Sequence, residues 1–181
     1  QTGGELYRMV DDLRQRAGKL AREYGYPDQE VLSAAAMRRL VDSPLYHGGI
    51  LDRGAAHLHP LNYALGLARA AVAAGVRIHE HSTVTGFAGD GPVRVTTAGG
   101  EVTARHLVLG CNGYLGGLAP GIASRIMPIN NYLVATAPLG DLGPRLIADP
   151  ACVHDTLFVV NYFRLAPDGR LVFGGGETYT R

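Results

Sequence analysis

Two residues of one predicted strand have the chemistry to bind an acidic group of a small molecule. Tyr162 and Arg164 lie two positions apart in an apolar run typical of a strand, so both side chains should point to the same face. A guanidinium beside a phenol hydroxyl suits a carboxylate, which accepts hydrogen bonds from both. The alternative is an exposed arginine beside a tyrosine at an interface, and the pattern alone leaves both interpretations open.

A glycine-containing loop is a second candidate, for a nucleotide. The apolar run 106–110 is typical of a buried parallel strand, and it leads directly into Gly110, Cys111, Asn112 and Gly113. Ligands of open α/β sheets bind beyond the carboxyl ends of parallel strands, where small residues let a nucleotide approach the backbone. A tight turn into a short helix explains the same residues equally well.

Several other chemistries lack their motifs. The chain contains no GxGxxG, no GxxxxGK[ST] and no GxSxG, which disfavours an NAD-dependent Rossmann enzyme, a P-loop NTPase and a serine hydrolase. His57 and His59, like His79 and His81, are two residues apart, but no cysteine or carboxylate at useful spacing completes a metal-ligand set. We interpret these histidines as surface or structural residues and expect no metal site.

The composition limits which classes of partner and which cellular compartment we expect for this protein. The 181 residues carry a net charge of +1 and are 46% hydrophobic, so we expect a buried core and no binding of nucleic acid or of a membrane surface. No apolar run reaches the roughly 18 residues of a membrane span. The two cysteines are far apart and fit a reducing compartment, which predicts a cytoplasmic protein. Formation of a homo-oligomer stays open.

Local patterns predict the helices that would frame these sites. Apolar residues at spacings of three and four indicate a helix over 4–25, and Ser33 is typical of the N-cap of a short helix. Pro60 suits the first turn of a third helix, for which Gly75 supplies a left-handed end. The run 76–80 follows at once and is predicted to be a strand, so that helix and strand make half of a βαβ unit.

Alternating patterns predict antiparallel sheet for much of the remaining chain. Short strands separated by turns are expected across 82–103 and would form a meander. Farther on, 127–137 and 153–165 have the pattern of two long strands. The turn 167–169, which contains Asp-Gly, predicts a hairpin from the second of these into 170–174.

An ordered series of short motifs extends through most of the chain. The motifs are YHGGILD at 46–52, HLHPLNYA at 57–64, LVLGCNGY at 107–114 and DGRLVFGG at 168–175. Their order resembles that of the D-amino acid oxidase-like family of FAD-dependent oxidoreductases, in particular the branch of gamma-glutamylputrescine oxidoreductases. The resemblance covers roughly residues 20–181.

This resemblance implies a mixed α/β (α+β) fold in two kinds of domain. One would be part of an FAD-binding Rossmann-like domain with a β meander, and the other an antiparallel-sheet substrate domain. Residues 1–56 would supply the helices and first strand of the substrate domain, 57–118 a partial FAD-binding domain, and 119–181 the substrate-domain sheet.

The resemblance also implies where FAD and substrate bind. The residue that matches Val84 would contact adenine through its backbone, and the loop described above would pass the adenosine side. The residues expected at the cofactor are therefore Val84, Gly110, Cys111, Asn112 and Gly113. The strand with Tyr162 and Arg164 would line the pocket over the flavin, and His47 is a further candidate for the wall of that pocket.

The reaction implied by the family is hydride transfer from the carbon beside a substrate amine to flavin N5, and it identifies no catalytic side chain. Family members begin with a strand and a GxGxxG loop that holds the pyrophosphate, and neither occurs in this chain. We therefore expect an internal fragment of an FAD-dependent amine or amino-acid oxidoreductase, inactive and without FAD by itself. The alternative is a binding module without catalytic activity.

Overall fold

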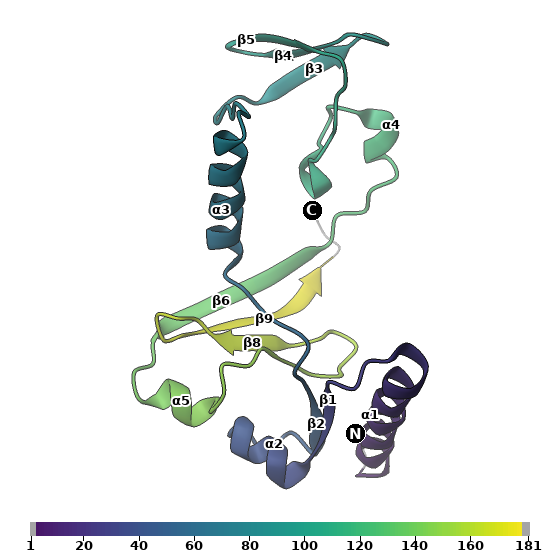
Figure 1. Ribbon diagram of the computed structural model, residues 1–181, viewed down its shortest axis with the longest axis vertical. Coiled ribbons are helices and arrows are strands. Elements are labelled where there is room, and N and C mark those ends of the chain that lie inside the picture. Colours follow the sequence, from purple (N-terminus) through teal and green to yellow (C-terminus); the bar gives the residue numbers. More distant parts are fainter. Residues whose placement is uncertain (1–2, 179–181) are drawn as a thin grey trace. The chain divides into compact units, whose positions relative to one another are not determined.

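Contacts divide the chain into two units, which are described separately. The computed structural model describes the backbone of residues 3–178 and the side chains of residues 9–176 (Figure 1). The first unit comprises the residues up to His59 together with Asn131–Glu177, and the second comprises Pro60–Asn130. The second unit is thus inserted into the sequence of the first. The division predicted from the sequence has its boundaries after residues 56 and 118.

The N-terminal part of the first unit combines two helices with a two-stranded ribbon. Its elements are α1 (Gly3–Tyr24), β1 (Gln29–Ser33), α2 (Ala34–Leu40) and β2 (Gly48–Asp52). The strands β1 and β2 are antiparallel. The Ser33 hydroxyl accepts a hydrogen bond from the backbone N–H of Ala36 at 3.2 Å, so the predicted N-cap is confirmed.

Two adjacent glycines let both helices approach the ribbon closely. A Cβ on Gly48 would lie 3.2 Å from a methyl group of Val10 in α1, and a Cβ on Gly49 would lie 3.2 Å from the Met37 sulfur in α2. Consecutive strand residues point to opposite faces. The helices α1 and α2 therefore cover opposite faces of the ribbon, and both contact β1 and β2.

The C-terminal part of the first unit is a four-stranded sheet in the order β6-β9-β8-β7 (Figure 1). Its elements are β6 (Asn130–Pro138), α5 (Leu142–Leu146), β7 (Val153–His154), β8 (Tyr162–Leu165) and β9 (Arg170–Thr178). The strand β8 is antiparallel to both β7 and β9. The predicted hairpin between β8 and β9 is confirmed, and the backbone N–H of Ala166 donates to the Arg170 carbonyl at its base.

The long strand predicted over 153–165 is wrong, because a loop interrupts it between β7 and β8. The Asp155 carboxylate fixes this loop by accepting the backbone N–H groups of Leu157 and Asn161, at 3.1 and 3.0 Å, and the Asn161 side-chain amide at 2.7 Å. These hydrogen bonds replace the ladder of a continuous strand. They leave Phe158 fully exposed at the loop tip.

An isolated bridge joins the two sequence-distant halves of the first unit. Val41 pairs with Ile147 in antiparallel fashion, and both side chains are buried. The backbone N–H of Asp42 donates to the Leu146 carbonyl, and that of Ala148 donates to the Leu40 carbonyl, each at 2.9 Å. The other buried apolar side chains of this unit are Ala17, Leu32 and Val153.

The second unit consists of a helix, a small sheet and a loop region. Its elements are α3 (Pro60–Ala73), β3 (Val84–Ala88), β4 (Val93–Thr97), β5 (Gly100–Ala104), the 3₁₀ helix η1 (Asn112–Tyr114) and α4 (Pro120–Ala123). The strands form an antiparallel sheet in the order β3-β4-β5. The predicted third helix and the meander are confirmed, and Gly75 has the expected left-handed φ of 90°.

Two predicted strands of the second unit are wrong. Residues 76–80 and 106–110 form no strand, and Val108 is 87% exposed. A parallel strand needs hydrogen-bonding neighbours, and every described strand pair with a defined register is antiparallel. The mixed α/β character with antiparallel sheets is confirmed. The Rossmann-like part of the fold stays a prediction.

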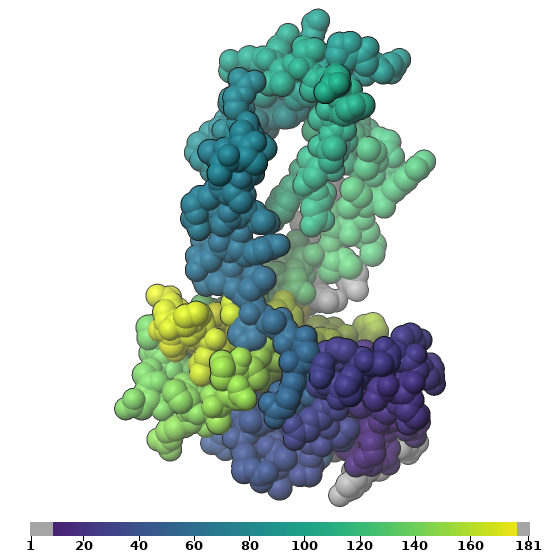
Figure 2. All heavy atoms as spheres, viewed as in Figure 1, coloured from purple at the N-terminus to yellow at the C-terminus, as the bar shows by residue number. Residues whose placement is uncertain are grey.

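The helix α3 has no buried residue, and Figure 2 shows its side chains uncovered on the face in view. Leu61, Leu65 and Val72 of its apolar stripe are between 47% and 61% exposed. Within the described part of the second unit, Leu115 is the single buried hydrophobic residue. None of the described helices is long and apolar enough to cross a lipid bilayer.

Candidate substrate and cofactor sites

The face of β8 that carries Tyr162 and Arg164 is the candidate substrate site. In the register with β9, Tyr162 lies opposite Gly174 and Arg164 lies opposite Val172, so the prediction that both side chains lie on one strand is confirmed. A Cβ on Gly174 would lie 2.2 Å from the Tyr162 ring. The Tyr162 ring therefore lies directly over β9 at a position that only glycine permits.

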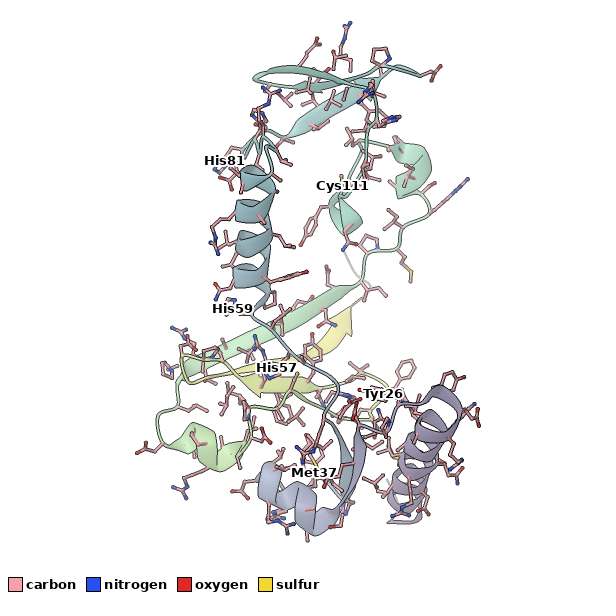
Figure 3. All side chains as sticks on the ribbon, in the orientation of Figure 1. Tyr26, Met37, His57, His59, His81 and Cys111 are labelled. Carbon is pink, nitrogen blue, oxygen red and sulfur yellow. The ribbon has the colours of Figure 1, made fainter. Side chains whose placement is uncertain are left out.

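Neutral partners hold both polar groups of this face. The Tyr162 hydroxyl crosses β9 and donates to the Asn131 side-chain oxygen on β6 at 2.5 Å. The Nη1 atom of Arg164 lies 3.1 Å from Nδ1 of His57. Figure 3 shows His57 on the segment that connects β2 to α3, beside the sheet of the first unit. These partners hold Tyr162 and Arg164 in place, and because neither partner is an acid, the positive charge of Arg164 is retained.

None of the described acidic side chains neutralises the charge of Arg164. Among the side chains that the structure describes, no carboxylate oxygen lies within 4.0 Å of its guanidinium, whereas the nearby Arg170 on β9 pairs with Asp168 at 2.9 Å. Arg164 is only half-exposed. A half-buried arginine with a neutral partner can bind an anion with its remaining N–H donors.

A hydrogen-bond network around Asp52 fixes the start of the segment that carries His57. The Asp52 carboxylate accepts the Tyr26 hydroxyl at 2.5 Å, the Gln29 amide at 2.9 Å, and the backbone N–H groups of Gly54 and Ala55 at 3.1 Å each. The hydrogen bond from Gln29, followed by that from Tyr26, lowers the pKa of Asp52. The same bond to Asp52 raises the pKa of Tyr26 to about 12.

His47, the third predicted substrate residue, is exposed in the bend that precedes β2. It forms no hydrogen bond or ion pair with any described residue, so its place in a pocket wall stays a prediction. In the described part of the chain, no three His, Cys, Asp or Glu side chains are grouped closely enough to hold a metal ion.

A pocket of the second unit brings two predicted cofactor residues together. Val84 of β3 and Cys111 both line a cavity of about 530 Å³. Its other walls come from the sheet, the run 107–109 and the segment 114–118. The run predicted to be a buried strand is therefore a pocket wall instead.

The remaining predicted cofactor residues lie around this pocket rather than in it. Gly113 lines a neighbouring hollow of about 670 Å³, which shares Leu115, Gly116 and Gly117 with the first. Gly110 and Asn112 line neither. Asn112 has a left-handed φ of 48° and begins η1, so the loop also forms the tight turn into a short helix that was the alternative interpretation.

The pocket fits the adenosine half of FAD. Its volume lies within the range of small-molecule sites, and its walls are mainly apolar, as an aromatic base requires. No charged side chain lines it, so it has no group that would neutralise a pyrophosphate. The residues present can hold the adenine and its ribose, whereas a pyrophosphate grip is absent from the described lining.

Comparison with known proteins decides the family. The family model described as FAD dependent oxidoreductase (DAO) matches residues 4–181. The chain belongs to this family of FAD-dependent oxidoreductases. The resemblance inferred from the ordered motifs is thereby confirmed.

Three relatives show the same affiliation but are much longer. The chain is 38% identical over 178 residues to a Rhizobium meliloti protein named "Probable oxidoreductase OrdL", covering 98% of this chain and 41% of that protein. It is 41% identical over 158 residues to the gamma-glutamylputrescine oxidoreductase of Escherichia coli, and the match covers 86% of this chain and 37% of that protein. A Haemophilus influenzae protein of the OrdL name is 34% identical over 177 residues, covering 94% and 41%. The chain therefore spans about two fifths of each relative.

Sequence reasoning missed two residues that contact the candidate substrate residues, His57 and Asn131. His57 was interpreted as a surface or structural histidine, and it hydrogen-bonds to Arg164, 107 positions away. Asn131 bonds to Tyr162 across 31 positions. Neither spacing corresponds to a local motif. The position of His57 just before the Pro60 helix, at the end of the Asp52 turn, is the one sequence feature that could have drawn attention to it.

Proposed function

We propose that residues 1–181 are part of an FAD-dependent oxidoreductase that oxidises a small molecule carrying both an amine and a carboxylate. Family membership supports the cofactor class. The name of the E. coli relative supports the substrate class, because it combines a glutamyl group with the amine putrescine. The observation that carries the proposal is the half-exposed Arg164, which has a neutral partner and no described acid within reach.

Arg164 would bind the substrate carboxylate. One of its five N–H donors is directed to His57, and the others remain for an anion. The planar guanidinium matches a carboxylate with two parallel hydrogen bonds, which fixes orientation as well as affinity. The carboxylate would thereby be held at β8, on the same face as the Tyr162 phenol.

Tyr162 would contact the substrate through the free lone pairs of its oxygen. Its proton is used by Asn131, so the oxygen can only accept a further hydrogen bond, for example from a substrate N–H. An acceptor beside a carboxylate-binding cation suits a molecule that carries both an acid and an amine. These two residues position the substrate, and we assign neither of them a proton-transfer role.

In the second unit, Val84 and Cys111 would lie against the adenosine half of the cofactor. When bound, FAD would supply the acceptor for the hydride that leaves the carbon beside the substrate amine. The side chains of this pocket would exclude water from the base and hold it by apolar contact. A pyrophosphate grip would come from residues outside this pocket.

The test uses the parent protein, the longer chain to which these residues would belong. We expect it to purify with flavin absorption near 450 nm (roughly, as for any bound flavin) and to oxidise an amine that carries a carboxylate. Arg164→Met should raise KM for that amine about 10- to 100-fold, because a charge-assisted hydrogen bond is lost. It should leave KM for the same amine without its carboxylate unchanged. Arg170→Met is the matched control, since Arg170 pairs with Asp168. Equal effects on both amines, or a colourless protein, would contradict the proposal.

A binding module without catalytic activity remains the second candidate, and the uncharged lining of the pocket favours it. It predicts that the isolated chain of 181 residues binds FAD weakly or not at all. Titration of the chain with FAD, followed by flavin fluorescence, tests this expectation, and oxidation of an amine by the flavin-containing parent protein distinguishes the first candidate from the second. Stoichiometric binding by the isolated chain would contradict this second candidate.

A further inference from the structure

We propose that His57 is a positioning residue for the carboxylate site, which holds the Arg164 guanidinium in its binding orientation. The inference rests on the proposed function of Arg164. His57 lies between two partners: its Nε2 is 2.7 Å from the Pro150 carbonyl oxygen, and its Nδ1 is 3.1 Å from Nη1 of Arg164. The imidazole thus links the loop before β7 to the strand β8.

The chemistry of the two partners fixes the state of the imidazole. A carbonyl oxygen only accepts, so Nε2 must carry the hydrogen that is directed to Pro150. A guanidinium only donates, so Nδ1 must present its lone pair to Arg164. Both contacts exist together only in the neutral ring with hydrogen on Nε2. The hydrogen bond from Nε2 to the Pro150 carbonyl thereby leaves Nδ1 as the acceptor for Arg164. Metal-bound histidines are set in the same way, since the hydrogen bond of one ring nitrogen fixes the state of the other.

The backbone that carries His57 is itself fixed. Asp52 at the end of β2 accepts the N–H groups of Gly54 and Ala55, and the N–H of Arg53 donates to the Asp28 carbonyl at 2.9 Å. The segment therefore leaves the ribbon in one direction. This preformed path brings His57 to β8 without help from a ligand.

Positioning is useful because arginine loses much side-chain freedom when it binds an anion. A free arginine loses side-chain entropy when it binds an anion, and a guanidinium already held by His57 has less to lose. The neutral imidazole restrains the cation without neutralising it, which an aspartate in the same place would do. The expected consequence is tighter binding of the carboxylate, with no change in the chemical step.

Three variants of His57 in the parent protein separate its two contacts. His57→Asn places an acceptor near the Nδ1 position and retains the contact to Arg164. His57→Gln places a donor near the Nε2 position and retains the contact to Pro150, and His57→Ala removes both. We expect KM for the carboxylate-bearing amine to rise about tenfold in His57→Ala and His57→Gln, as for one lost hydrogen bond, and less than about threefold in His57→Asn. The value of kcat should change less than twofold in all three.

The controls separate this inference from the proposed function. If Arg164→Met fails to weaken binding of the carboxylate selectively, the proposed function is wrong. The positioning role alone is wrong if Arg164→Met weakens carboxylate binding selectively but His57→Ala leaves KM unchanged. It is also wrong if KM rises as much in His57→Asn as in His57→Gln. In an Arg164→Met background, His57→Ala should add no further rise in KM. Should His57→Ala fold poorly, the comparison of Asn with Gln decides by itself.

Discussion

The most direct test of the geometry at the candidate substrate site is Gly174→Ala. The added Cβ would lie 2.2, 2.3 and 2.6 Å from three atoms at the tip of the Tyr162 side chain. Carbon atoms in contact are separated by about 3.5–4.0 Å, so the ring must move by more than about 1 Å. The Tyr162 hydroxyl lies 2.5 Å from the Asn131 oxygen, and such a movement breaks this hydrogen bond.

The expected loss of stability follows from these two effects. The lost hydrogen bond costs about 1 kcal/mol, and overpacking beside a buried backbone position costs about 1–3 kcal/mol. We expect the free energy of unfolding, measured in urea on the parent protein, to fall by about 2–4 kcal/mol, the sum of these ranges. Gly86→Ala on β3 is the matched control, because a Cβ there meets nothing within 4 Å; it should be neutral or slightly stabilising.

A double-mutant cycle gives the result that would refute this reasoning. In a Tyr162→Ala background the ring is gone, so Gly174→Ala should cost less than about 0.5 kcal/mol. Additive costs for the two substitutions would show that the Tyr162 ring does not lie over Gly174.

Two further predictions concern the first unit. The hydrogen bond to Asp52 raises the pKa of Tyr26 from 10.0 to about 12, so its stabilising effect is complete below pH 10 and is lost as the pH rises toward 12. The free energy of unfolding in urea should therefore fall across that pH range in the wild type. An equal fall in Tyr26→Phe, which lacks the hydroxyl, would contradict this prediction. Asp155→Ala removes the acceptor of three hydrogen bonds, so chymotrypsin should cleave after the exposed Phe158 more than about tenfold faster. Asp168→Ala, in the β8–β9 turn, is the control, and equal cleavage rates would show that Asp155 does not hold the loop.

The elements that local chemistry specifies were predictable from the sequence. Ser33, Pro60 and Gly75 act on their immediate neighbours, and the Asp168-Gly169 turn needs only the flanking residues to form a hairpin. Period-two spacing was likewise sufficient to place Tyr162 and Arg164 on one strand. In each case the determining interactions lie within a few residues.

The failures arose where the determining interactions are distant. The runs 76–80 and 106–110 have the apolar character of parallel strands, but a strand forms only with hydrogen-bonding neighbours, which the described chain does not supply. The break in the run 153–165 is an exception, because it depends on local hydrogen bonds of the Asp155 side chain to residues two and six positions along the chain, which the alternating pattern does not reveal. His57 reaches the candidate substrate site through a contact that spans 107 positions of the chain.

The inserted position of the second unit has a consequence for the order of folding. During synthesis, α1, the β1–β2 ribbon and α2 can form early, because their contacts are local. The Val41–Ile147 bridge and the contacts of His57 with Pro150 and Arg164 must wait until the ribosome has also made residues 60–130. The contact between His57 and Arg164 on β8 can therefore form only after the whole second unit has been synthesised, and a nascent chain that stops within that unit lacks it.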